Sequence, residues 1–304
     1  MEAIVFEEFG GPGVLHLAQS ADPHPGPGQV RVKVRAAGVN PVDYKIRKGW
    51  MEQVFPTALP ATPGSEFAGV VDEVGDEVTE FAVGDEVLGW SATGAYATHA
   101  LADADAIAPK PTELSWENAA ALPVVTETAA RVLDELGVGD GDTLLLHGAA
   151  GGVGSAGVQL ALARGATVIG TASPANHTYL RELGAIPVAY GEGLVDRVRE
   201  AAPQGVDAVF DAAGRGALPD SIELRGGTTD RIVTIADMDA AKYGVTFSAG
   251  GTERSNARLA ENARAAAAGR LRVPVARTFA LGDAVKAHEL SEGGHVRGKL
   301  VLLP

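Results

Sequence analysis

The sequence predicts an α/β protein of two parts, in which a β-rich region precedes a parallel sheet covered by helices. Three observations support this fold class. Valines alternate with charged residues near the N-terminus, strands and helices alternate from residue 142 onward, and a glycine-rich turn at 148–154 joins an apolar strand to a helix of small residues. The 304 residues, 46% of them hydrophobic, are enough to bury the core of one large domain or two ordinary ones.

The first region is predicted from a period-two pattern. Val30, Val32 and Val34 alternate with arginine and lysine, which is typical of a strand with one buried face. Clusters of glycine and proline at 23–28 and 60–64 indicate turns between such strands. We therefore expect a β-rich region that ends near Trp116.

The second region is predicted from alternation. Residues 117–137 are rich in alanine and leucine and predict one helix. The strands expected beyond it are 143–147, 167–171, 206–211 and 231–236, and the expected helices are 153–163, 176–183, 194–201 and 252–269. This alternation is typical of a parallel sheet. Residues 272–304 return to strand, helix and strand, and this short segment is expected to complete the first domain.

The glycine turn is the strongest functional motif. Residues 148–154 read Gly-Ala-Ala-Gly-Gly-Val-Gly, between an apolar strand ending at His147 and a helix that contains Gly157. Glycines let the backbone approach a ligand, and the N–H groups of a helix N-terminus attract a diphosphate. Because strand, turn, helix and a second strand follow in the required order, the motif predicts dinucleotide binding on a Rossmann domain.

The end of the second strand indicates which dinucleotide binds. Proteins that bind NAD place a carboxylate there, about 20 residues after the glycines, to hold the ribose 2′-hydroxyl. No acidic residue lies between Gly154 and Glu182. The polar residues that follow the strand are Ser173, Asn176, His177 and Arg181. They suit a 2′-phosphate and favour NADPH. The alternative is a polar loop in a protein that accepts either cofactor.

Composition excludes several classes of function. The net charge of −14, without a run of lysine or arginine, argues against nucleic-acid binding. The absence of cysteine excludes disulfides, cysteine-bound zinc and iron–sulfur clusters. The first eight residues have no basic region before an apolar run, so we expect no signal peptide, and no apolar stretch approaches the ~20 residues of a membrane helix. We expect a cytoplasmic protein without a membrane partner.

Further motifs, read in order, resemble the medium-chain dehydrogenase/reductase superfamily, in particular its zinc-independent quinone oxidoreductase branch. These motifs besides the glycine turn are Ala37–Asp43, Pro63–Gly69, Val83–Gly89, Gly94–Ala97, Ala120–Pro123 and Gly298–Leu302. The resemblance implies a GroES-like β-rich catalytic domain at 1–118, completed by 270–304, and a Rossmann NADPH-binding domain at 119–269, with the active site in the cleft between them.

The resemblance also implies how this chain departs from zinc alcohol dehydrogenases. Those enzymes carry a cysteine within the segment that matches Gly38–Asn40, and Gly-His-Glu where this chain has Gly64-Ser65-Glu66. They also carry a lobe with four cysteines, which is missing here. We therefore expect no metal, and without a Lewis acid the oxidation of simple alcohols is disfavoured. A quinone or enone needs less activation because its own π system spreads the incoming charge.

The resemblance supplies most of the candidate site residues. Asn40 matches an asparagine beside the nicotinamide, and the alternative is an asparagine that satisfies a turn before Pro41. Tyr44 or Lys45 would donate a proton, unless each is an ordinary surface residue. The cofactor-binding candidates are Asn40, Thr128, Gly148, Ala149, Ala150, Gly151, Gly152, Val153, Gly154, Thr171, Ser173, His177, Tyr190, Ala212, Ala213, Gly214, Ile235 and Lys299.

The expected function is hydride transfer from NADPH to a small quinone or activated enone, without zinc. Two alternatives stay open: an enoyl or alkenal reductase acting on C=C bonds, and a non-catalytic NADPH-binding protein. We also expect a homodimer, because members of this branch commonly pair through their Rossmann domains. The segment Val245–Ser248 predicts a late strand whose open edge invites pairing.

Overall fold

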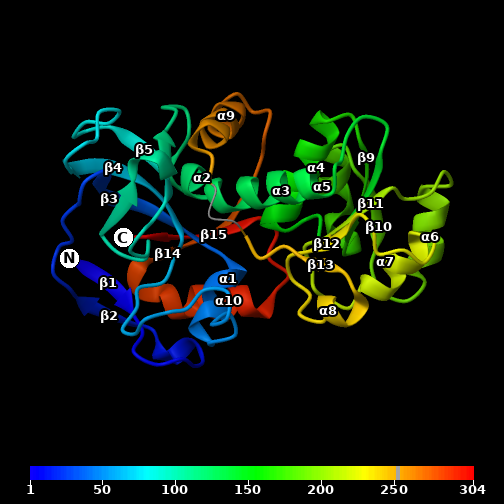
Figure 1. The fold of residues 1–304 in the computed structure, drawn as a ribbon, viewed down its shortest axis with the longest axis horizontal. Coiled ribbons are helices and arrows are strands. Elements are labelled where there is room, and N and C mark those ends of the chain that lie inside the picture. The colour runs from blue at the N-terminus through cyan, green and yellow to red at the C-terminus, as the bar shows by residue number, and fades with distance from the viewer. Residues whose placement is uncertain (251–253) are drawn as a thin grey trace. The chain divides into compact units, whose positions relative to one another are not determined.

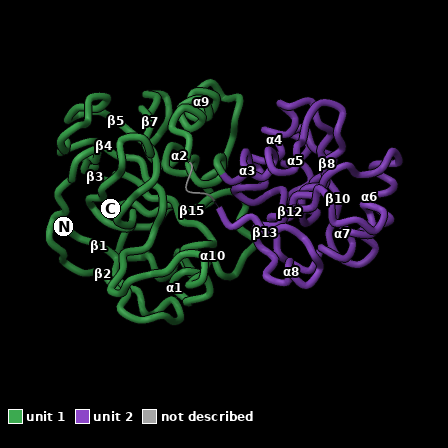
Figure 2. Tube along the Cα trace, viewed as in Figure 1, with its two compact units in different colours: residues 1–127, 253–304 green, residues 128–252 purple. Residues whose placement is uncertain are grey.

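The chain forms two compact units in the computed structural model, which describes residues 1–250 and 254–304. One unit comprises 1–127 and 253–304, and the other comprises 128–252 (Figure 2). The sequence placed the domain boundaries at 118/119 and 269/270 instead. The difference at the second boundary concerns the alanine-rich helix, α9 (Asn256–Ala267), which belongs to the first unit. Residues 252 and 253 of the expected helix lie outside the described residues.

The first unit is built mainly from strands (Figure 1). Its strands are β1 (Glu2–Val5), β2 (His16–Gln19), β3 (Gln29–Val39), β4 (Glu66–Val74), β5 (Glu86–Trp90), β6 (His99–Asp103), β7 (Ile107–Pro109), β14 (Val275–Ala280) and β15 (Lys299–Leu303). Its helices, besides α9, are α1 (Pro41–Arg47), α2 (Trp116–Ala120) and α10 (Ala284–Gly293), with short 3₁₀ turns at Pro12–Val14, Ala104–Ala106 and Leu281–Asp283.

Strand β3 organises the main sheet of this unit. The sheet order is β14-β15-β3-β4-β5-β7, and β6 also pairs with β3. β4 pairs along one side of β3, while β6 and β15 share the other side. As the alternation predicts, Val30, Val32 and Val34 are buried in the core. The C-terminal segment joins this sheet through β15, which is antiparallel to β3.

The single helix expected at 117–137 is in fact two helices, α2 and α3 (Pro123–Glu135). α2 begins after Ser115, whose Oγ accepts a hydrogen bond of 3.2 Å from the Asn118 N–H. Pro123 breaks the helix because it has no N–H and disfavours the helical conformation of the residue before it. The prediction of one continuous helix was therefore wrong at this proline.

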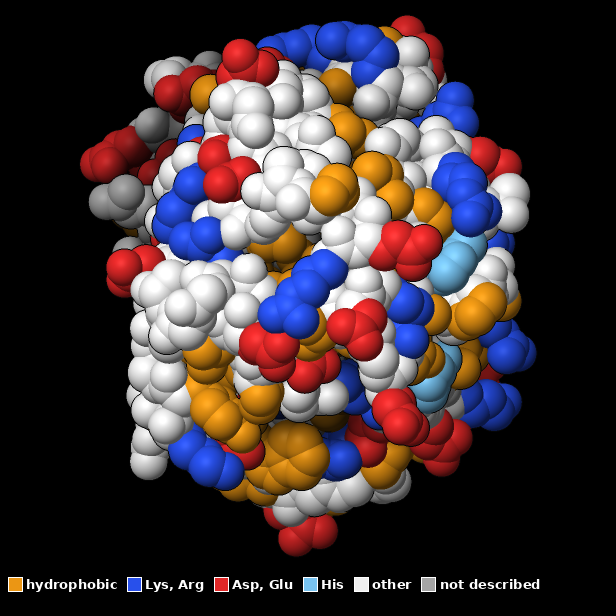
Figure 3. All heavy atoms as spheres, turned by 90° about the vertical axis from the view of Figure 1, so that its right-hand side faces the viewer, with side chains coloured by type: hydrophobic (Ala, Val, Ile, Leu, Met, Phe, Trp, Pro, Cys, Tyr) orange, Lys and Arg blue, Asp and Glu red, His pale blue; other side chains and the backbone are white. Residues whose placement is uncertain are grey.

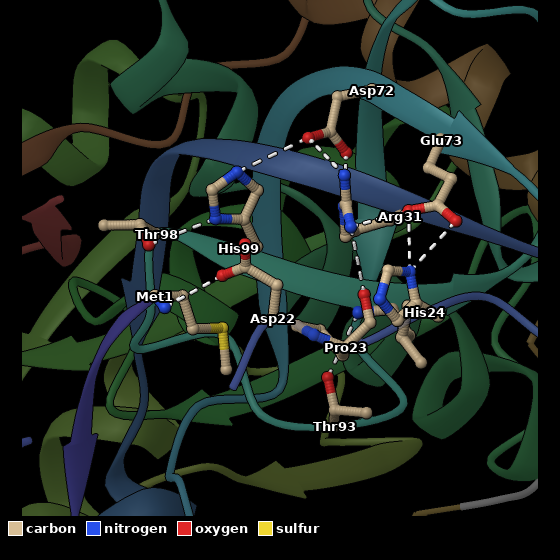
Figure 4. Close-up of polar contacts among 11 residues, drawn as sticks. Met1, Asp22, Pro23, His24, Arg31, Asp72, Glu73, Thr93, Thr98 and His99 are labelled. Atoms are coloured by element: carbon tan, nitrogen blue, oxygen red, sulfur yellow. Dashed lines mark hydrogen bonds and ion pairs between the residues drawn. The ribbon is translucent and has the colours of Figure 1, made fainter. Parts of the chain in front are cut away.

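An ion cluster around Arg31 fixes the N-terminal segment to the sheet (Figure 4). The Arg31 guanidinium pairs with Asp72 on β4 at 2.9 Å and with Glu73 at 2.6 Å. His24 lies 3.1 Å from Glu73, and His99 on β6 lies 3.4 Å from Asp72. These side chains are only partly buried, and ion pairs that remain in contact with solvent contribute little to stability individually. We assign this cluster a structural role.

The second unit is a parallel sheet with helices (Figure 1). Its strands are β8 (Thr143–His147), β9 (Thr167–Ala172), β10 (Ile186–Ala189), β11 (Ala208–Asp211), β12 (Ile232–Thr234) and β13 (Thr246–Phe247). Its helices are α4 (Gly152–Ala163), α5 (His177–Glu182), α6 (Leu194–Ala201), α7 (Leu218–Leu224) and α8 (Ala240–Tyr243), with a 3₁₀ turn at Pro174–Asn176, and α3 contains the boundary between the units.

The strand order of the second unit is that of a Rossmann sheet. All neighbours are parallel, in the order β10-β9-β8-β11-β12-β13. Numbered from β8, this order is 3-2-1-4-5-6, in which the strand order reverses between β8 and β11. Ligands bind such sheets beyond the carboxyl ends of the strands at that point. The fold class predicted from the sequence is confirmed.

Charges of both signs are mixed on the surface of the protein. On the face drawn in Figure 3, lysine and arginine side chains are interspersed with aspartate and glutamate. Ion pairs in the second unit include Arg199 with Glu223 and Arg231 with Asp142. Across residues 1–250 and 254–304, no helix has the length and apolar character needed to cross a bilayer.

Candidate functional site

The glycine turn depends on the conformation of Gly148 and on a close backbone contact at Gly154. Gly148 follows β8 with a φ of +73°, a conformation that favours glycine. A Cβ atom at Gly154 would lie 2.2 Å from the Gly148 carbonyl oxygen and 2.7 Å from the Ala149 Cα. Because backbone atoms cannot move aside as a flexible side chain does, position 154 requires glycine.

The N-terminus of α4 faces this turn without a side-chain cap. Its N-cap residue is Gly151, which makes no side-chain hydrogen bond. The first N–H groups of a helix have no partner within the helix, so those of Gly152 and Val153 are available to an anion. Gly157 brings α4 close to β8, since a Cβ there would lie 2.9 Å from Leu146 Cδ1.

A buried histidine, His147, is hydrogen-bonded to the threonine that contacts the turn. His147 Nε2 lies 3.0 Å from Ser221 Oγ, and its Nδ1 lies 3.2 Å from Thr171 Oγ1. Thr171 Oγ1 in turn accepts from the Gly148 N–H at 3.4 Å. Burial lowers the pKa of His147, so the ring is neutral at pH 7. Thr171 therefore fixes the turn, while its expected contact with a cofactor stays a prediction.

The end of β9 gathers the polar residues expected beside a 2′-phosphate. Asn176 Nδ2 donates to Ser173 Oγ at 3.3 Å, and His177 Nε2 lies 3.4 Å from the Ala172 carbonyl oxygen. All three side chains are half-buried. Arg181 and Tyr190 are exposed, Tyr190 by 54%. The structure thus brings Ser173, Asn176 and His177 together in a loop without a carboxylate.

The loop after β11 is held by Asp211. Its Oδ1 accepts from the N–H groups of Ala213 at 2.9 Å and Gly214 at 3.1 Å, and its Oδ2 accepts from Thr234 Oγ1 at 2.7 Å. The Ile235 N–H donates to the Asp211 carbonyl at 3.0 Å. Asp211 therefore caps this loop and shapes the segment 212–214 where the resemblance expects cofactor contacts.

In the first unit, Asn40 lies in a buried polar cluster. It precedes α1, at the end of β3, and its Nδ2 donates to Glu66 Oε1 at 2.7 Å. Lys299 Nζ donates to Asn40 Oδ1 and to Glu66 Oε1, at 2.5 Å each. Asn40 and Lys299, both expected as cofactor-binding residues, therefore lie side by side, joined by Glu66.

A second chain of buried groups holds the backbone of Asn40. The Asn40 N–H donates to Asp43 Oδ2 at 2.8 Å, and Tyr96 Oη donates to the same oxygen at 2.8 Å. His288 lies 3.4 Å from Tyr96 Oη and 3.1 Å from Arg47. Burial raises the pKa of Asp43 to about 6 and lowers that of His288 to about 3. The start of α1 is thus connected through Tyr96 to His288 on α10.

The remaining candidates lie on α1 and α3. Tyr44 and Lys45 are half-buried on α1. The Tyr44 ring packs edge-on against Trp50 at 6.5 Å between centroids, and Lys48 Nζ lies 5.5 Å from the Tyr44 ring. Thr128 is half-buried on α3. The catalytic roles of Tyr44 and Lys45 stay predictions.

The fold and the motifs match known proteins over the whole chain. The model of the alcohol dehydrogenase GroES-like domain matches residues 26–112, and that of the zinc-binding dehydrogenase matches residues 183–302. The human quinone oxidoreductase is 31% identical, and the match covers 100% of this chain and 98% of the relative. The mouse quinone oxidoreductase is 39% identical over 74% of this chain and 70% of its own length.

This chain belongs to the quinone oxidoreductase branch of the medium-chain dehydrogenase/reductase superfamily. A solved quinone oxidoreductase from Coxiella burnetii superimposes with a TM-score of 0.89 at 35% identity, covering 100% of this chain and 99% of that one. An Escherichia coli quinone oxidoreductase, solved in complex with NADPH, gives 0.85 at 28% identity over 100% of both chains. The family resemblance drawn from the motifs is confirmed.

One matching family model is named for zinc binding, but the residues of this chain do not fit a zinc ion. The sequence contains no cysteine. Glu66 has both carboxylate oxygens in hydrogen bonds to the protein. Among the described residues, no three His, Cys, Asp or Glu side chains are grouped as metal ligands would be.

Glu66 and Tyr96 lie within the motifs Pro63–Gly69 and Gly94–Ala97 but were not among the predicted site residues, and neither was His288. The local sequence does indicate that Glu66 and Lys299 each need a partner. Glu66 and Lys299 each stand directly before an apolar run in a strand, and a charge buried in such a place needs a partner. The partners are 233 positions apart, so no local pattern could pair them.

Proposed function

We propose that this chain transfers a hydride from NADPH to a quinone or conjugated enone. The observation that carries the proposal is the obligate glycine at 154 beside the uncapped start of α4, at the carboxyl end of β8. That cradle fits a diphosphate. The names of the relatives, and the NADPH bound to the Escherichia coli structure, support the same cofactor and class of acceptor.

The residues of the second unit fit NADPH. The N–H groups of Gly152 and Val153 would bind the diphosphate, and Ser173, Asn176 and His177 would bind the 2′-phosphate by hydrogen bonds. Bound NADPH would supply the hydride at the nicotinamide ring. The protein's own task is then to orient the ring and the acceptor and to provide a proton.

The residues of the first unit provide the polar groups. Asn40 would donate a hydrogen bond to a carbonyl oxygen, and Tyr44 or Lys45 would donate the proton. Tyr44→Phe and Lys45→Met separate the two donors, since loss of the true donor should lower kcat by about a hundredfold. Equal, small losses for both variants would argue for proton donation by water.

The proposed function is tested by NADPH oxidation, followed at the nicotinamide absorbance, with a panel of quinones and enones. Oxidation with a quinone supports the proposal. Faster turnover with 2-alkenals or enoyl substrates would favour the alternative, a C=C reductase. Tight NADPH binding without oxidation by any acceptor would favour a non-catalytic NADPH-binding protein.

We also propose a homodimer. β13 (Thr246–Phe247) is a terminal strand of the described parallel sheet, as the sequence predicted, and the unpaired N–H and C=O groups of an edge strand can pair with a second copy. Light scattering at micromolar concentration should give twice the mass of 31.1 kDa, and a monomer mass would contradict the proposal.

A further inference from the structure

Three buried side chains meet at the amide of Asn40. Glu66 is 0% exposed, Lys299 3% and Asn40 4%. They come from the starts of β4 and β15 and from the residue before α1, so three distant segments of the chain converge at one carboxamide.

The chemistry of these groups allows only one orientation of the amide. An ammonium group can only donate hydrogen bonds, and an ionised carboxylate can only accept them. Lys299 therefore faces Asn40 Oδ1, and Glu66 faces Nδ2. Turning the amide over would place N–H against ammonium and C=O against carboxylate. The orientation of the amide therefore follows from the two charges on either side of it.

One donor remains after these bonds are made. All three hydrogens of the Lys299 ammonium have acceptors, namely Asn40 Oδ1, Glu66 Oε1 and the Val39 carbonyl at 3.2 Å. Asn40 Nδ2 carries two hydrogens and gives one to Glu66. No acceptor among the described residues takes the other. Lys299 has thus no donor left for a cofactor, whereas Asn40 has one.

Glu66 is itself held by two further contacts. Its second oxygen, Oε2, accepts from the Val124 N–H at the start of α3, at 2.7 Å. On its other side is Gly38, where a Cβ atom would lie 2.2 Å from Glu66 Oε1. The carboxylate therefore has one position, set by the cap of a helix and by the absence of a side chain at residue 38.

We propose that Glu66 and Lys299 are a positioning pair that fixes the Asn40 carboxamide as a hydrogen-bond donor to a carbonyl oxygen. The oxygen belongs either to the acceptor or to the nicotinamide carboxamide. This inference rests on the proposed function, because Glu66 and Lys299 would influence hydride transfer only by positioning Asn40. A buried ion pair often stabilises a protein no more than apolar residues of equal volume would. Stability alone therefore does not explain why Glu66 and Lys299 are buried here, whereas positioning of the Asn40 carboxamide does.

The decisive experiment replaces the pair without leaving a buried charge. In Glu66→Gln/Lys299→Met the side-chain carbonyl at position 66 can still accept from the Val124 N–H. The new amide NH₂ then lies beside the Asn40 carboxamide and favours its reversed orientation, in which Oδ1 accepts from that NH₂. We expect folding to be retained and kcat for quinone reduction to fall by about a hundredfold. Lys299→Arg, which keeps a donor and the charge, is the matched control and should recover most of kcat.

A mutant cycle shows whether the pair acts through Asn40. In an Asn40→Ala background, Glu66→Gln/Lys299→Met should cause no further loss of kcat, because the group it positions is gone. The same loss in both backgrounds, or an unchanged kcat in the first, would overturn the inference. Wild-type NADPH oxidation is measured separately, so failure of the proposed function is distinguishable from failure of the pair.

The source of the oxygen is read from NADPH affinity. An unchanged Kd for NADPH with a lowered kcat assigns the oxygen to the acceptor, and a raised Kd assigns it to the nicotinamide. If the double variant does not fold, a crystal of the wild-type protein with NADPH and a quinone analogue decides. A carbonyl oxygen about 3 Å from Nδ2 supports the inference, and a donor facing Oδ1 overturns it.

Discussion

The two units present polar groups in different ways. In the second unit, the groups offered at the turn are backbone N–H groups, made accessible by glycines at 148, 151 and 154. In the first unit, the group offered is the side chain of Asn40, held by buried charges. A backbone site is broken by filling space, whereas a side-chain site is broken by changing the polarity of its neighbours. Each kind of change should therefore damage one unit and spare the other.

The largest effect is expected from filling the turn. Gly154→Val places atoms where the Gly148 carbonyl already lies, so the turn must open and the diphosphate loses its donors. The Kd for NADPH, measured by fluorescence titration, should rise by more than about a hundredfold. Gly139→Ala is the control, since a Cβ there meets nothing within 4 Å. An unchanged Kd in Gly154→Val would show that this turn does not bind the cofactor.

The next effect concerns charge in the first unit and depends on pH. The pKa of Asp43 is about 6 in the folded state against 3.8 for an aspartate in water, because burial favours its protonated form. The folded state therefore binds this proton more tightly, and its contribution to stability is complete below pH 3.8 and is lost as the pH rises through about 6. The loss is about 3 kcal/mol.

Asp43→Asn removes this titration. Urea unfolding at several pH values between 3.5 and 7 should show wild-type stability falling relative to the variant as the pH rises. His288, which titrates with the opposite slope, is present in both proteins and cancels from the difference. The exposed Asp105→Asn serves as the control. Parallel curves for wild type and Asp43→Asn would contradict the prediction.

A smaller effect is expected where the second unit does use side chains. Ser173→Asp places a carboxylate in the loop after β9, where it would repel a 2′-phosphate and accept from a 2′-hydroxyl. The ratio of kcat/KM for NADPH to that for NADH should exceed about ten in the wild type and should invert in the variant. Ser173→Thr, which keeps the hydroxyl, should keep the preference. Equal kcat/KM values in the wild type would leave this loop as ordinary surface.

The smallest effect is expected from removing metals. Because the residues around Glu66 are bonded to one another and do not fit a zinc ion, exhaustive chelation should leave kcat unchanged within error. Loss of activity that zinc specifically restores would show that a site has been overlooked in the first unit.

Local and distant contacts differ in how far they could be predicted from the sequence. β8, the glycine turn and α4 lie within about twenty consecutive residues, so their order was readable and the structure agrees closely. The edge strand β10 was missed because Pro187 interrupts it, and an edge strand tolerates a proline that a central strand does not. The pairing of Glu66 with Lys299 depends on the packing of distant strands, and no local pattern contains it.

Because Gly38 has no side chain, the Glu66 carboxylate can lie against it, so substitutions at positions 38 and 66 are not independent. Since a methyl group at residue 38 would lie 2.2 Å from Glu66 Oε1, we expect the residues tolerated at 38 and at 66 to depend on each other. A side chain at residue 38 would force the Glu66 side chain out of its present position, and a shorter residue at 66 would relieve the overlap. Libraries that vary the two together should recover active combinations that neither single change permits.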